Sequence, residues 1–410
     1  MSPCPQVIII ADDLTGAADA AAGIAARGLV TFLPLARIPS APTDALVFTT
    51  ESRALSRDQA VRKTRDLVAR LKESGSLDTA RIVYKKIDST LRGHPAAELT
   101  TLMEETGSDR ALVAPAFPAQ GRTTIGSRQF VAGVRLENTE FGRAIETSDL
   151  TKIFADAHDL VTPLSLEEIR SSQERLRSLF CRAAPYLVLA DAETEDDLVR
   201  LAQAASAAGL RLFCGSAGLI SALLGLDGWT SEVPAPNLPP VRTGPGLIVA
   251  GSRHARTREQ IRFIESKGAV VLRVAPRPPM SASEFSASVR RASRALQDGQ
   301  HVVLALEEEE DGSPDSTEVA RLLAGVCLEV VRHTSPAFLA LTGGDTATAV
   351  CNALDVSAIR LLGEIAPGIP QARLQGGVLS DLPVATKAGG FGGPDALAVV
   401  LQYFQSGSRV

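Results

Sequence analysis

The chain is poor in aromatic residues and cysteine, and neither charge is in strong excess. Only 4% of its 410 residues are aromatic, and its formal net charge is −5. No block of lysine and arginine runs along any segment. A nucleic-acid or membrane partner is therefore not expected. Plentiful small apolar side chains favour layers in which helices press closely on sheets.

The five cysteines are scattered and form no CxxC pair. Such a set disfavours a disulfide framework and a zinc cluster, and it fits a reducing compartment. The first residues, MSPCPQVIIIADD, lack the basic segment of a signal peptide. No segment has the apolar length that spans a bilayer. We expect a cytoplasmic protein without a metal site built from its own side chains.

Short apolar runs alternate with amphipathic stretches, such as the predicted helix 58–73. Continuous apolar runs with helices between them predict parallel sheets that are covered on both faces. The predicted fold class is therefore α/β, with two α/β domains and mainly parallel sheets. The predicted strands are Val7–Ile10, Ala45–Thr49, Ile82–Lys86, Ala111–Ala114, Tyr186–Ala190, Leu212–Cys214, Leu247–Ala250, Val270–Val274, Val302–Leu306, Phe338–Leu341 and Val384–Lys387.

The stretch from Val233 to Gly246 holds five prolines and two glycines, which excludes regular helix and central strand. It is the predicted linker (233–246) between a substrate domain (1–232) and a nucleotide-binding domain (247–410). The segment from Gly126 to Thr162 shows the weakest pattern, and we expect hairpins or a lid there.

Two aspartates, Asp12 and Asp13, follow the first predicted strand and precede a helix of small residues. In open α/β sheets, ligands bind at this edge. On an extended chain the two side chains point in opposite directions. One can then face a ligand while the other caps the helix. The alternative, in which both only cap and solvate the turn, competes on equal terms.

The sequence KKIDSTLRGH, residues 85–94, follows another predicted strand and packs charged and hydroxyl side chains into one loop. Such a loop can offer a carboxylate arginine donors, hydroxyls and a lysine charge together. Arg53 and Arg122 follow two further strands. A solvated charged surface is the alternative, but polar groups at several strand ends favour one crevice for an acidic small molecule.

Glycine turns follow three predicted strands in the second half: Gly251-Ser252, the run Gly343–Thr346, and the run AGGFGG after Lys387. Glycine lets a phosphate approach the backbone, and helix N-termini supply free N–H donors. Each turn alone is explained equally well by tight chain reversal, whereas the three together predict a nucleotide cradle. Neither GxxxxGK[ST] nor a strict GxGxxG after the first strand is present.

Together these motifs resemble the four-carbon acid sugar kinase family, over nearly the whole chain. The resemblance rests on IIADDLTGA, KKIDSTLRG, APAFPAQGRTT, NTEF, GSAG, VAGS, LTGGDTA, GEIAPGIP and KAGGFG. It implies phosphorylation of a four-carbon sugar acid with ATP, by two domains that close on each other. It implies a sugar-acid site formed by Asp12, Arg53, Lys86, Asp88, Ser89, Thr90, Arg92 and Arg122. It implies an ATP site formed by Ser252, Gly343, Gly344, Asp345, Thr346 and Gly389.

The chain departs from the family pattern at three places; the first two leave the reaction class unchanged, and the third leaves the substrate identity open. The chain has KAGGFG where relatives often have KSGNFG, and Asp345 where many have glutamate. The stretch after Phe141 lacks the expected proline pattern. The form KKIDSTLRG favours threonate or erythronate over a 3-oxo-tetronate.

The hypothesis is therefore in-line transfer from ATP, with Mg²⁺ as cofactor, to the terminal hydroxyl of the acid. Asp12 is the first candidate for the catalytic carboxylate, and Asp88 is the second. The alternatives from other classes are a nicotinamide-dependent sugar-acid dehydrogenase and a non-catalytic sugar-acid sensor. The sugar acid and ATP are the expected partners, and a homodimer is left open.

Overall fold

The computed structural model describes residues 5–155, 161–181, 186–231, 233, 243–275, 280–307 and 316–406. The chain divides into two compact units. The first unit comprises Met1–Ala20, Gly28–Val30 and Ser40–Pro234, and the second comprises Ala21–Arg27, Thr31–Pro39 and Ala235–Val410. Most of the predicted linker, residues 234–242, lies outside the described residues, so the domain limits stay a prediction.

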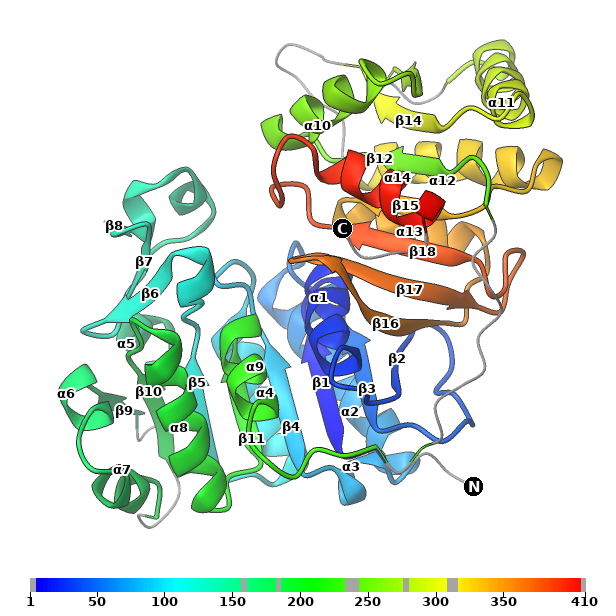
Figure 1. The fold of residues 1–410 in the computed structure, drawn as a ribbon. Helices are drawn as coiled ribbons and strands as arrows, with labels where there is room; N and C mark the ends of the chain where they lie inside the picture. The colour runs from blue at the N-terminus through cyan, green and yellow to red at the C-terminus, as the bar shows by residue number, and fades with distance from the viewer. Residues whose placement is uncertain are drawn as a thin grey trace. The chain divides into compact units, whose positions relative to one another are not determined.

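A parallel sheet forms the centre of the first unit (Figure 1), as the continuous apolar runs predict. Its strands are almost wholly buried at the centre, and β1 is buried at every position. Each described pair in this sheet is parallel. In spatial order the strands are β3 (Ala45–Thr49), β1 (Val7–Ala11), β4 (Ile82–Lys86), β11 (Leu212–Gly215), β5 (Arg110–Ala114), β10 (Tyr186–Ala190) and β9 (Val161–Leu164).

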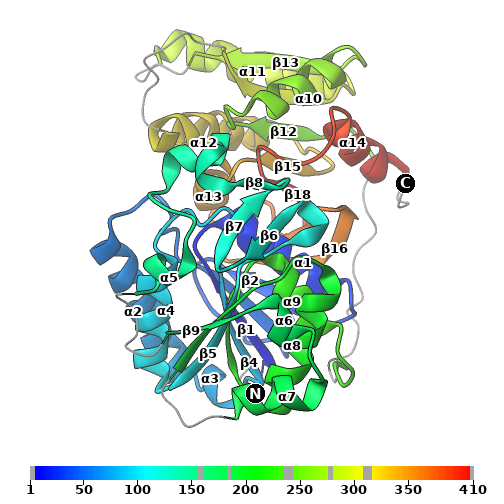
Figure 2. The ribbon, with the colours of Figure 1, turned by 90° about the vertical axis from the view of Figure 1, so that its left-hand side faces the viewer.

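Helices cover both faces of this sheet (Figures 1 and 2). On one face, α2 (Arg57–Glu73) packs on α4 (Pro95–Thr106); on the other, α8 (Glu195–Ala207) packs on α9 (Ala217–Leu224). The helix α2 begins at a capping box between Ser56 and Gln59. The first unit also contains α3 (Ser76–Thr79), α5 (Leu150–Ile153), α6 (Leu166–Ile169) and α7 (Gln173–Phe180), and the division between the units falls within α1 (Leu14–Ala25).

The GSAG motif at the β11–α9 turn brings backbone segments into close contact. A Cβ atom at Gly218 would lie 2.8 Å from the carbonyl oxygen of Ala116, and one at Gly215 would lie 2.7 Å from the Tyr84 hydroxyl. Side chains are excluded at both positions. This motif therefore has a packing role in the first unit.

The segment after β5 forms an antiparallel three-stranded sheet, within the described residues. It contains β6 (Arg122–Ile125), β7 (Arg128–Val131) and β8 (Val134–Arg135). The expected hairpins between Gly126 and Thr162 are thus confirmed, whereas a lid role stays a prediction. Single-turn 3₁₀ helices accompany them: η1 (Pro118–Gln120), η2 (Leu136–Asn138) and η3 (Glu140–Ala144).

The sheet of the second unit is parallel at one side and antiparallel at the other. The strands β13, β14, β12, β15 and β18 pair in parallel. From β17 onward the pairing is antiparallel. In spatial order the strands are β13 (Val270–Val274), β14 (Val302–Leu306), β12 (Leu247–Ala250), β15 (Leu339–Thr342), β18 (Pro383–Lys387), β17 (Ile369–Gln375), β16 (Ala358–Ala366) and β2 (Thr31–Pro34).

Three aromatic residues pack together in the core of the second unit. Phe338 and Phe404 stack with ring centroids 4.4 Å apart, and Tyr403 meets Phe404 edge-on at 5.3 Å. On this face α10 (Ala255–Glu265) packs on α14 (Ala396–Ser406); α11 (Ala282–Gln297), α12 (Ser316–His333) and α13 (Gly344–Ala353) pack together on the opposite face (Figures 1 and 2). Among the described helices, none is long and apolar enough to cross a membrane.

Candidate functional site

Asp12 and Arg53 meet at the carboxyl ends of the adjacent strands β1 and β3. Arg53 Nε donates to Asp12 Oδ2 at 2.9 Å, and Arg53 Nη2 donates to Asp12 Oδ1 at 2.8 Å. This two-point contact fixes the plane of the carboxylate. The Asp12 side chain is only 3% exposed. Asp12 is therefore a buried, oriented carboxylate at the ligand-binding edge of a parallel sheet.

Asp13 contacts the same guanidinium and also caps α1. Its carboxylate oxygens accept from Arg53 Nη1 and Nη2, each at 2.8 Å. Its Oδ1 also accepts from the Gly16 N–H at 3.0 Å, which is the contact of an N-cap. The expected division into one ligand-facing and one capping aspartate fits Asp13 as the cap. The expected opposite orientation of the two side chains is wrong, because the chain leaves the extended conformation after Ala11.

The loop after β4 wraps around a second carboxylate, Asp88. The Thr90 N–H donates to Asp88 Oδ1 at 3.1 Å, and the Thr90 hydroxyl donates to Oδ2 at 2.9 Å. Arg92 Nε donates to Oδ2 as well. Leu91 lies between them with φ 58°, a left-handed conformation that costs a branched side chain energy. This strained residue lies where the loop folds back, so that Thr90 and Arg92 both contact Asp88.

Gly93 closes this loop against the first carboxylate. Its φ is +87°, and a Cβ atom there would lie 3.2 Å from Asp12 Oδ2 and 3.5 Å from the Arg53 Cα. The loop can therefore approach Asp12 this closely only with glycine at this position. The structure brings Asp12, Arg53 and the loop of Asp88 into one cluster.

Charge interactions within the cluster hold both carboxyl groups in the ionised form. Burial alone would raise the pKa of Asp12, but the charge of Arg53 and its hydrogen bonds bring that pKa below the ordinary value. Burial likewise opposes the ionisation of Asp88, and Arg53 and Arg92 bring its pKa well below the ordinary value. At neutral pH both groups accept hydrogen bonds and hold no proton.

Lys86, the last residue of β4, and Ser89, in the loop after it, each have their own contacts. Lys86 is buried, and its Nζ donates to the carbonyl oxygen of Ile87 at 3.0 Å. The carbonyl oxygen of Ser89 accepts from Gln129 Nε2 at 2.9 Å, and Gln129 Oε1 accepts from the Thr124 hydroxyl at 2.7 Å. The β6–β7 hairpin thus supports the loop that carries Asp88.

Arg122, at the start of β6, is joined to the cluster through its charge. Burial lowers the pKa of its guanidinium, and the nearby charge of Asp88 opposes that effect. Its Nη1 donates to the carbonyl oxygen of Gln120. Within the described residues, its buried Nε has no hydrogen-bond partner. A buried donor without a partner is costly, and an anionic ligand would satisfy it.

A buried ion pair lies beneath the cluster, and sequence reasoning missed it. Lys85 Nζ is 3.2 Å from Glu98 Oε2, and the two side chains are 0% and 1% exposed. Their alignment is not that of a hydrogen bond, so the attraction is electrostatic. The Ser52 hydroxyl donates to Glu98 Oε1. Because Ser52 precedes Arg53, this pair supports the backbone that presents the arginine.

The glycine turns of the second unit converge around Ser252, at the carboxyl ends of β12, β15 and β18. A Cβ atom at Gly389 would overlap the Ser252 hydroxyl, and one at Gly343 would lie 3.4 Å from the Ser252 Cβ. The Gly343 N–H donates to the Lys387 carbonyl oxygen at 2.9 Å. Gly343 also has φ +100°. The predicted residues Ser252, Gly343 and Gly389 therefore meet at one sheet edge.

The run Gly344–Thr346 forms the first turn of α13, directly after Gly343. Asp345 is exposed there, and Thr346 is buried. A Cβ atom at Gly251 would overlap the Thr346 hydroxyl. The N-terminus of α13 thus presents free N–H groups and an exposed carboxylate beside Ser252.

Replacement of Gly389 by alanine is expected to weaken ADP binding at least tenfold, because the new methyl group displaces the Ser252 hydroxyl. Isothermal titration calorimetry with ADP measures the effect. Gly325→Ala, in the interior of α12 where the nearest side-chain atom would be 3.7 Å away, is the matched control and leaves affinity unchanged. Equal affinities for wild type and Gly389→Ala would contradict the assignment.

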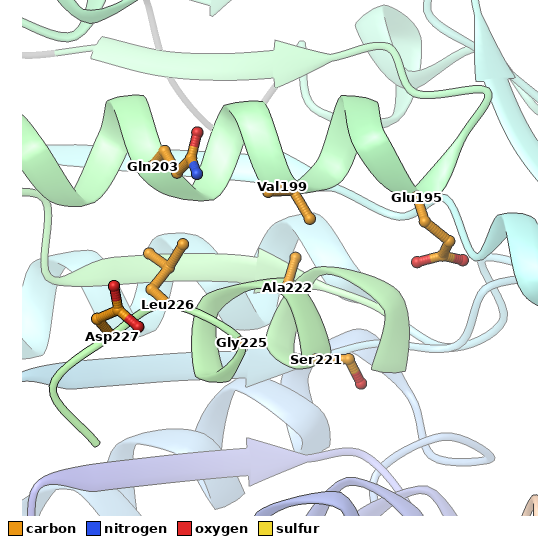
Figure 3. Close-up of a pocket in the computed structure, with 8 residues that line it drawn as sticks. All are labelled: Glu195, Val199, Gln203, Ser221, Ala222, Gly225, Leu226 and Asp227. Atoms are coloured by element: carbon orange, nitrogen blue, oxygen red, sulfur yellow. The ribbon is translucent and has the colours of Figure 1, made fainter. Parts of the chain in front are cut away.

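A groove of about 490 Å³ lies elsewhere on the first unit, between α8 and α9. Figure 3 shows Glu195 toward one end and Asp227 toward the other, with the apolar Val199 and Leu226 along its walls. The Glu195 carboxylate accepts from the Ala119 N–H at 2.8 Å. The groove contains none of the predicted site residues, so the cluster around Asp12 remains the candidate site.

Two family models match the chain. One is described as a sugar-binding N-terminal domain and matches residues 7–223; the other is described as a nucleotide-binding C-terminal domain and matches residues 247–397. The D-threonate kinase of Salmonella typhimurium is 32% identical over 98% of each chain. The D-erythronate kinase of Heliobacterium modesticaldum is 30% identical over 97% of each chain.

A solved structure from Salmonella typhimurium supports the fold: it matches with a TM-score of 0.79 at 19% identity, over 97% of this chain and 99% of that one. The sugar-binding match contains the Asp12 cluster, and the nucleotide-binding match contains the glycine turns around Ser252. The chain belongs to the four-carbon acid sugar kinase family.

Proposed function

We propose that this enzyme transfers the γ-phosphoryl group of ATP to the terminal hydroxyl of a four-carbon sugar acid in carbohydrate-acid catabolism. D-Threonate and D-erythronate are favoured over a 3-oxo-tetronate. Relatives named D-threonate kinase are 32–33% identical to the chain, and a D-erythronate kinase is 30% identical. Relatives named 3-oxo-tetronate kinase are 24–28% identical.

The observation that carries the proposal is the ionised Asp12 carboxylate held at two points by Arg53. Phosphoryl transfer needs a positioned acceptor hydroxyl and stabilised negative charge more than it needs covalent chemistry. A fixed carboxylate accepts the hydrogen bond of the hydroxyl and aims its oxygen at phosphorus. The hydroxyl proton passes to this carboxylate as the O–P bond forms and the bond between phosphorus and the leaving oxygen of ADP breaks. Asp88 is the second candidate for this role.

The cationic groups around the two carboxylates suit the acid end of the substrate. Lys86, Arg92 and Arg122 Nε, which has no partner within the described ranges, supply charge-assisted donors. Arg53 is engaged by both aspartates and keeps Asp12 in place. Ser89 and Thr90 supply hydroxyl groups for the sugar hydroxyls.

Ser252, Gly343, Gly344, Asp345, Thr346 and Gly389 are proposed to hold ATP. Mg²⁺ prefers oxygen ligands and keeps several waters, with one or two protein carboxylates and the phosphates. The exposed carboxylate of Asp345 beside the helix N-terminus fits this donor set. When bound, the cation would neutralise charge on the phosphates.

The experiment is coupled ADP release with Mg²⁺ and ATP against D- and L-threonate, D- and L-erythronate, and 3-oxo-tetronates. We expect turnover with D-threonate or D-erythronate above all other acids. No turnover with any acid, from folded protein that binds ATP, would refute the substrate assignment.

Two further measurements on the same protein preparation distinguish the kinase from the two alternative activities. A nicotinamide-dependent dehydrogenase would change the absorbance of NAD when the acids are added. A sensor would bind the acids without releasing ADP.

The four described cysteines are free thiols, which supports a reducing compartment such as the cytoplasm.

A further inference from the structure

Two buried side chains contact the backbone of the glycine-rich loop between β18 and α14, residues 388–393. Lys387 Nζ donates to the carbonyl oxygens of Ala388 at 2.8 Å, Gly389 at 3.2 Å and Phe391 at 3.2 Å. Lys387 is 2% exposed. A buried ammonium is therefore surrounded by carbonyl oxygens of the loop that follows it.

Gln260, on α10, contacts the far half of the same loop. Its Nε2 donates to the carbonyl oxygens of Phe391 at 2.9 Å, Gly392 at 3.4 Å and Gly393 at 2.9 Å. Gln260 is fully buried, and its own Oε1 has no partner among the described residues. Leaving that oxygen unpaired costs free energy. The favourable contacts of this buried side chain are therefore those of its Nε2.

These contacts determine where the amide groups of the loop point. In a trans peptide the N–H lies opposite the preceding carbonyl. Since the carbonyl oxygens face Lys387 and Gln260, the N–H groups of Gly389, Gly390, Gly392 and Gly393 face the other way. In the described part of the chain, these four N–H groups donate to no protein acceptor. Outward-facing successive amides form a concavity that binds anions.

We propose that Lys387 and Gln260 are positioning residues that preset this loop so that its glycine amides bind the nucleotide phosphates. The inference rests on the proposed nucleotide site and adds to it how the loop is held. Gly389, within the loop, lies against Ser252, so the loop lies at the same strand ends as the predicted cradle. Lys387 acts through the loop and is distinct from a lysine that touches phosphate directly.

The charge of Lys387 is compatible with this role. Burial lowers the pKa of its ammonium to about 8, so it remains mostly charged at neutral pH. A positive charge behind the loop polarises the carbonyl groups and strengthens the donor character of the amides in front. Among the described residues Lys387 forms no ion pair with an acidic side chain, and its ammonium is bound by loop carbonyl oxygens.

The test uses wild-type protein labelled with ¹⁵N at glycine and titrated with tripolyphosphate, and separately with adenosine. We expect the amide signals of Gly389, Gly390, Gly392 and Gly393 to shift with tripolyphosphate and to stay in place with adenosine. Unmoved signals would overturn the proposal. This measurement needs no variant, so folding of a variant does not limit it.

Lys387→Met then tests the role of the ammonium, with the exposed Lys267→Met as the control for charge. The variant is expected to lose ADP affinity on the order of tenfold to a hundredfold while keeping adenosine affinity. An equal loss for both ligands would mean a merely structural role and would overturn the proposal. Failure of the proposed function would give a different result: the wild-type protein would release no ADP with any of the acids.

Discussion

Asp12→Asn is expected to lower the turnover number by about 10²- to 10⁴-fold, with ADP affinity unchanged. The asparagine keeps the shape of the side chain but loses the charge that Arg53 holds in place. Its amide has one acceptor oxygen where the carboxylate has two, and its NH2 group donates instead of accepting. Initial rates of ADP release at saturating acid, with circular dichroism to confirm folding, measure the effect.

Asp13→Asn is the matched control for Asp12, because the two residues are neighbours and share Arg53. Asparagine caps helices as well as aspartate does, so α1 is preserved. We expect the turnover number to stay within about tenfold of wild type, since Asp13 orients no substrate group in this account. Equal losses in the two variants would assign the effect to the Arg53 charge network and would remove Asp12 from its catalytic role.

Glu98→Gln is expected to lower the free energy of unfolding by about 3–5 kcal/mol. The change removes the counter-charge of the Lys85 ammonium, and the Lys85 side chain is 0% exposed. Chemical denaturation followed by circular dichroism measures the change. Because the Ser52 hydroxyl donates to Glu98, we also expect a higher KM for the acid in whatever folded fraction remains.

The double variant Lys85→Met/Glu98→Leu serves as the control for this pair. Replacing a buried ion pair by apolar residues of similar volume is often neutral, so it should recover most of the stability that Glu98→Gln loses. The exposed pair of Arg65 with Glu105 provides a second comparison, and Glu105→Gln should leave the unfolding midpoint unchanged. A stable Glu98→Gln variant would show that the pair is dispensable.

The parallel strands were predictable because buried central strands read as continuous apolar runs. β4 and β12 have the predicted bounds, and β1 differs by one residue. The antiparallel β16–β17 hairpin was missed, although β16 alternates between buried and partly exposed positions with the period of a strand. β2 pairs with β16 far along the chain, and no local pattern signals such a partner.

The candidate site was predictable at the level of strand ends, since the carboxyl ends of parallel strands share one edge. The contacts were not. A single guanidinium binding both Asp12 and Asp13 depends on a bend that the residue types alone do not reveal. Glu98 looks like an ordinary acid in the first turn of α4, and only the structure shows that it is buried against Lys85.

Sequence reasoning also missed the roles of Gln260 and Lys387 in the second unit, for the same reason. Gln260 is one polar residue of an amphipathic helix, and Lys387 ends an apolar strand. Their contacts with the glycine loop depend on how α10 lies against that loop, which sequence spacing does not give. The available signal was that Gln260 lies four residues before Ile264, on the apolar face of the helix, where a polar side chain is seldom placed unless it is paired.

The measurement that most directly tests the account is proton-coupled ³¹P nuclear magnetic resonance of the product formed from D-threonate, or from D-erythronate if that is the better substrate, with ATP and Mg²⁺. Transfer to the terminal hydroxyl predicts a phosphomonoester signal coupled to the two protons of the terminal carbon, formed in step with ADP. Inorganic phosphate alone, or a phosphoester coupled to a single proton, would contradict transfer to the terminal hydroxyl.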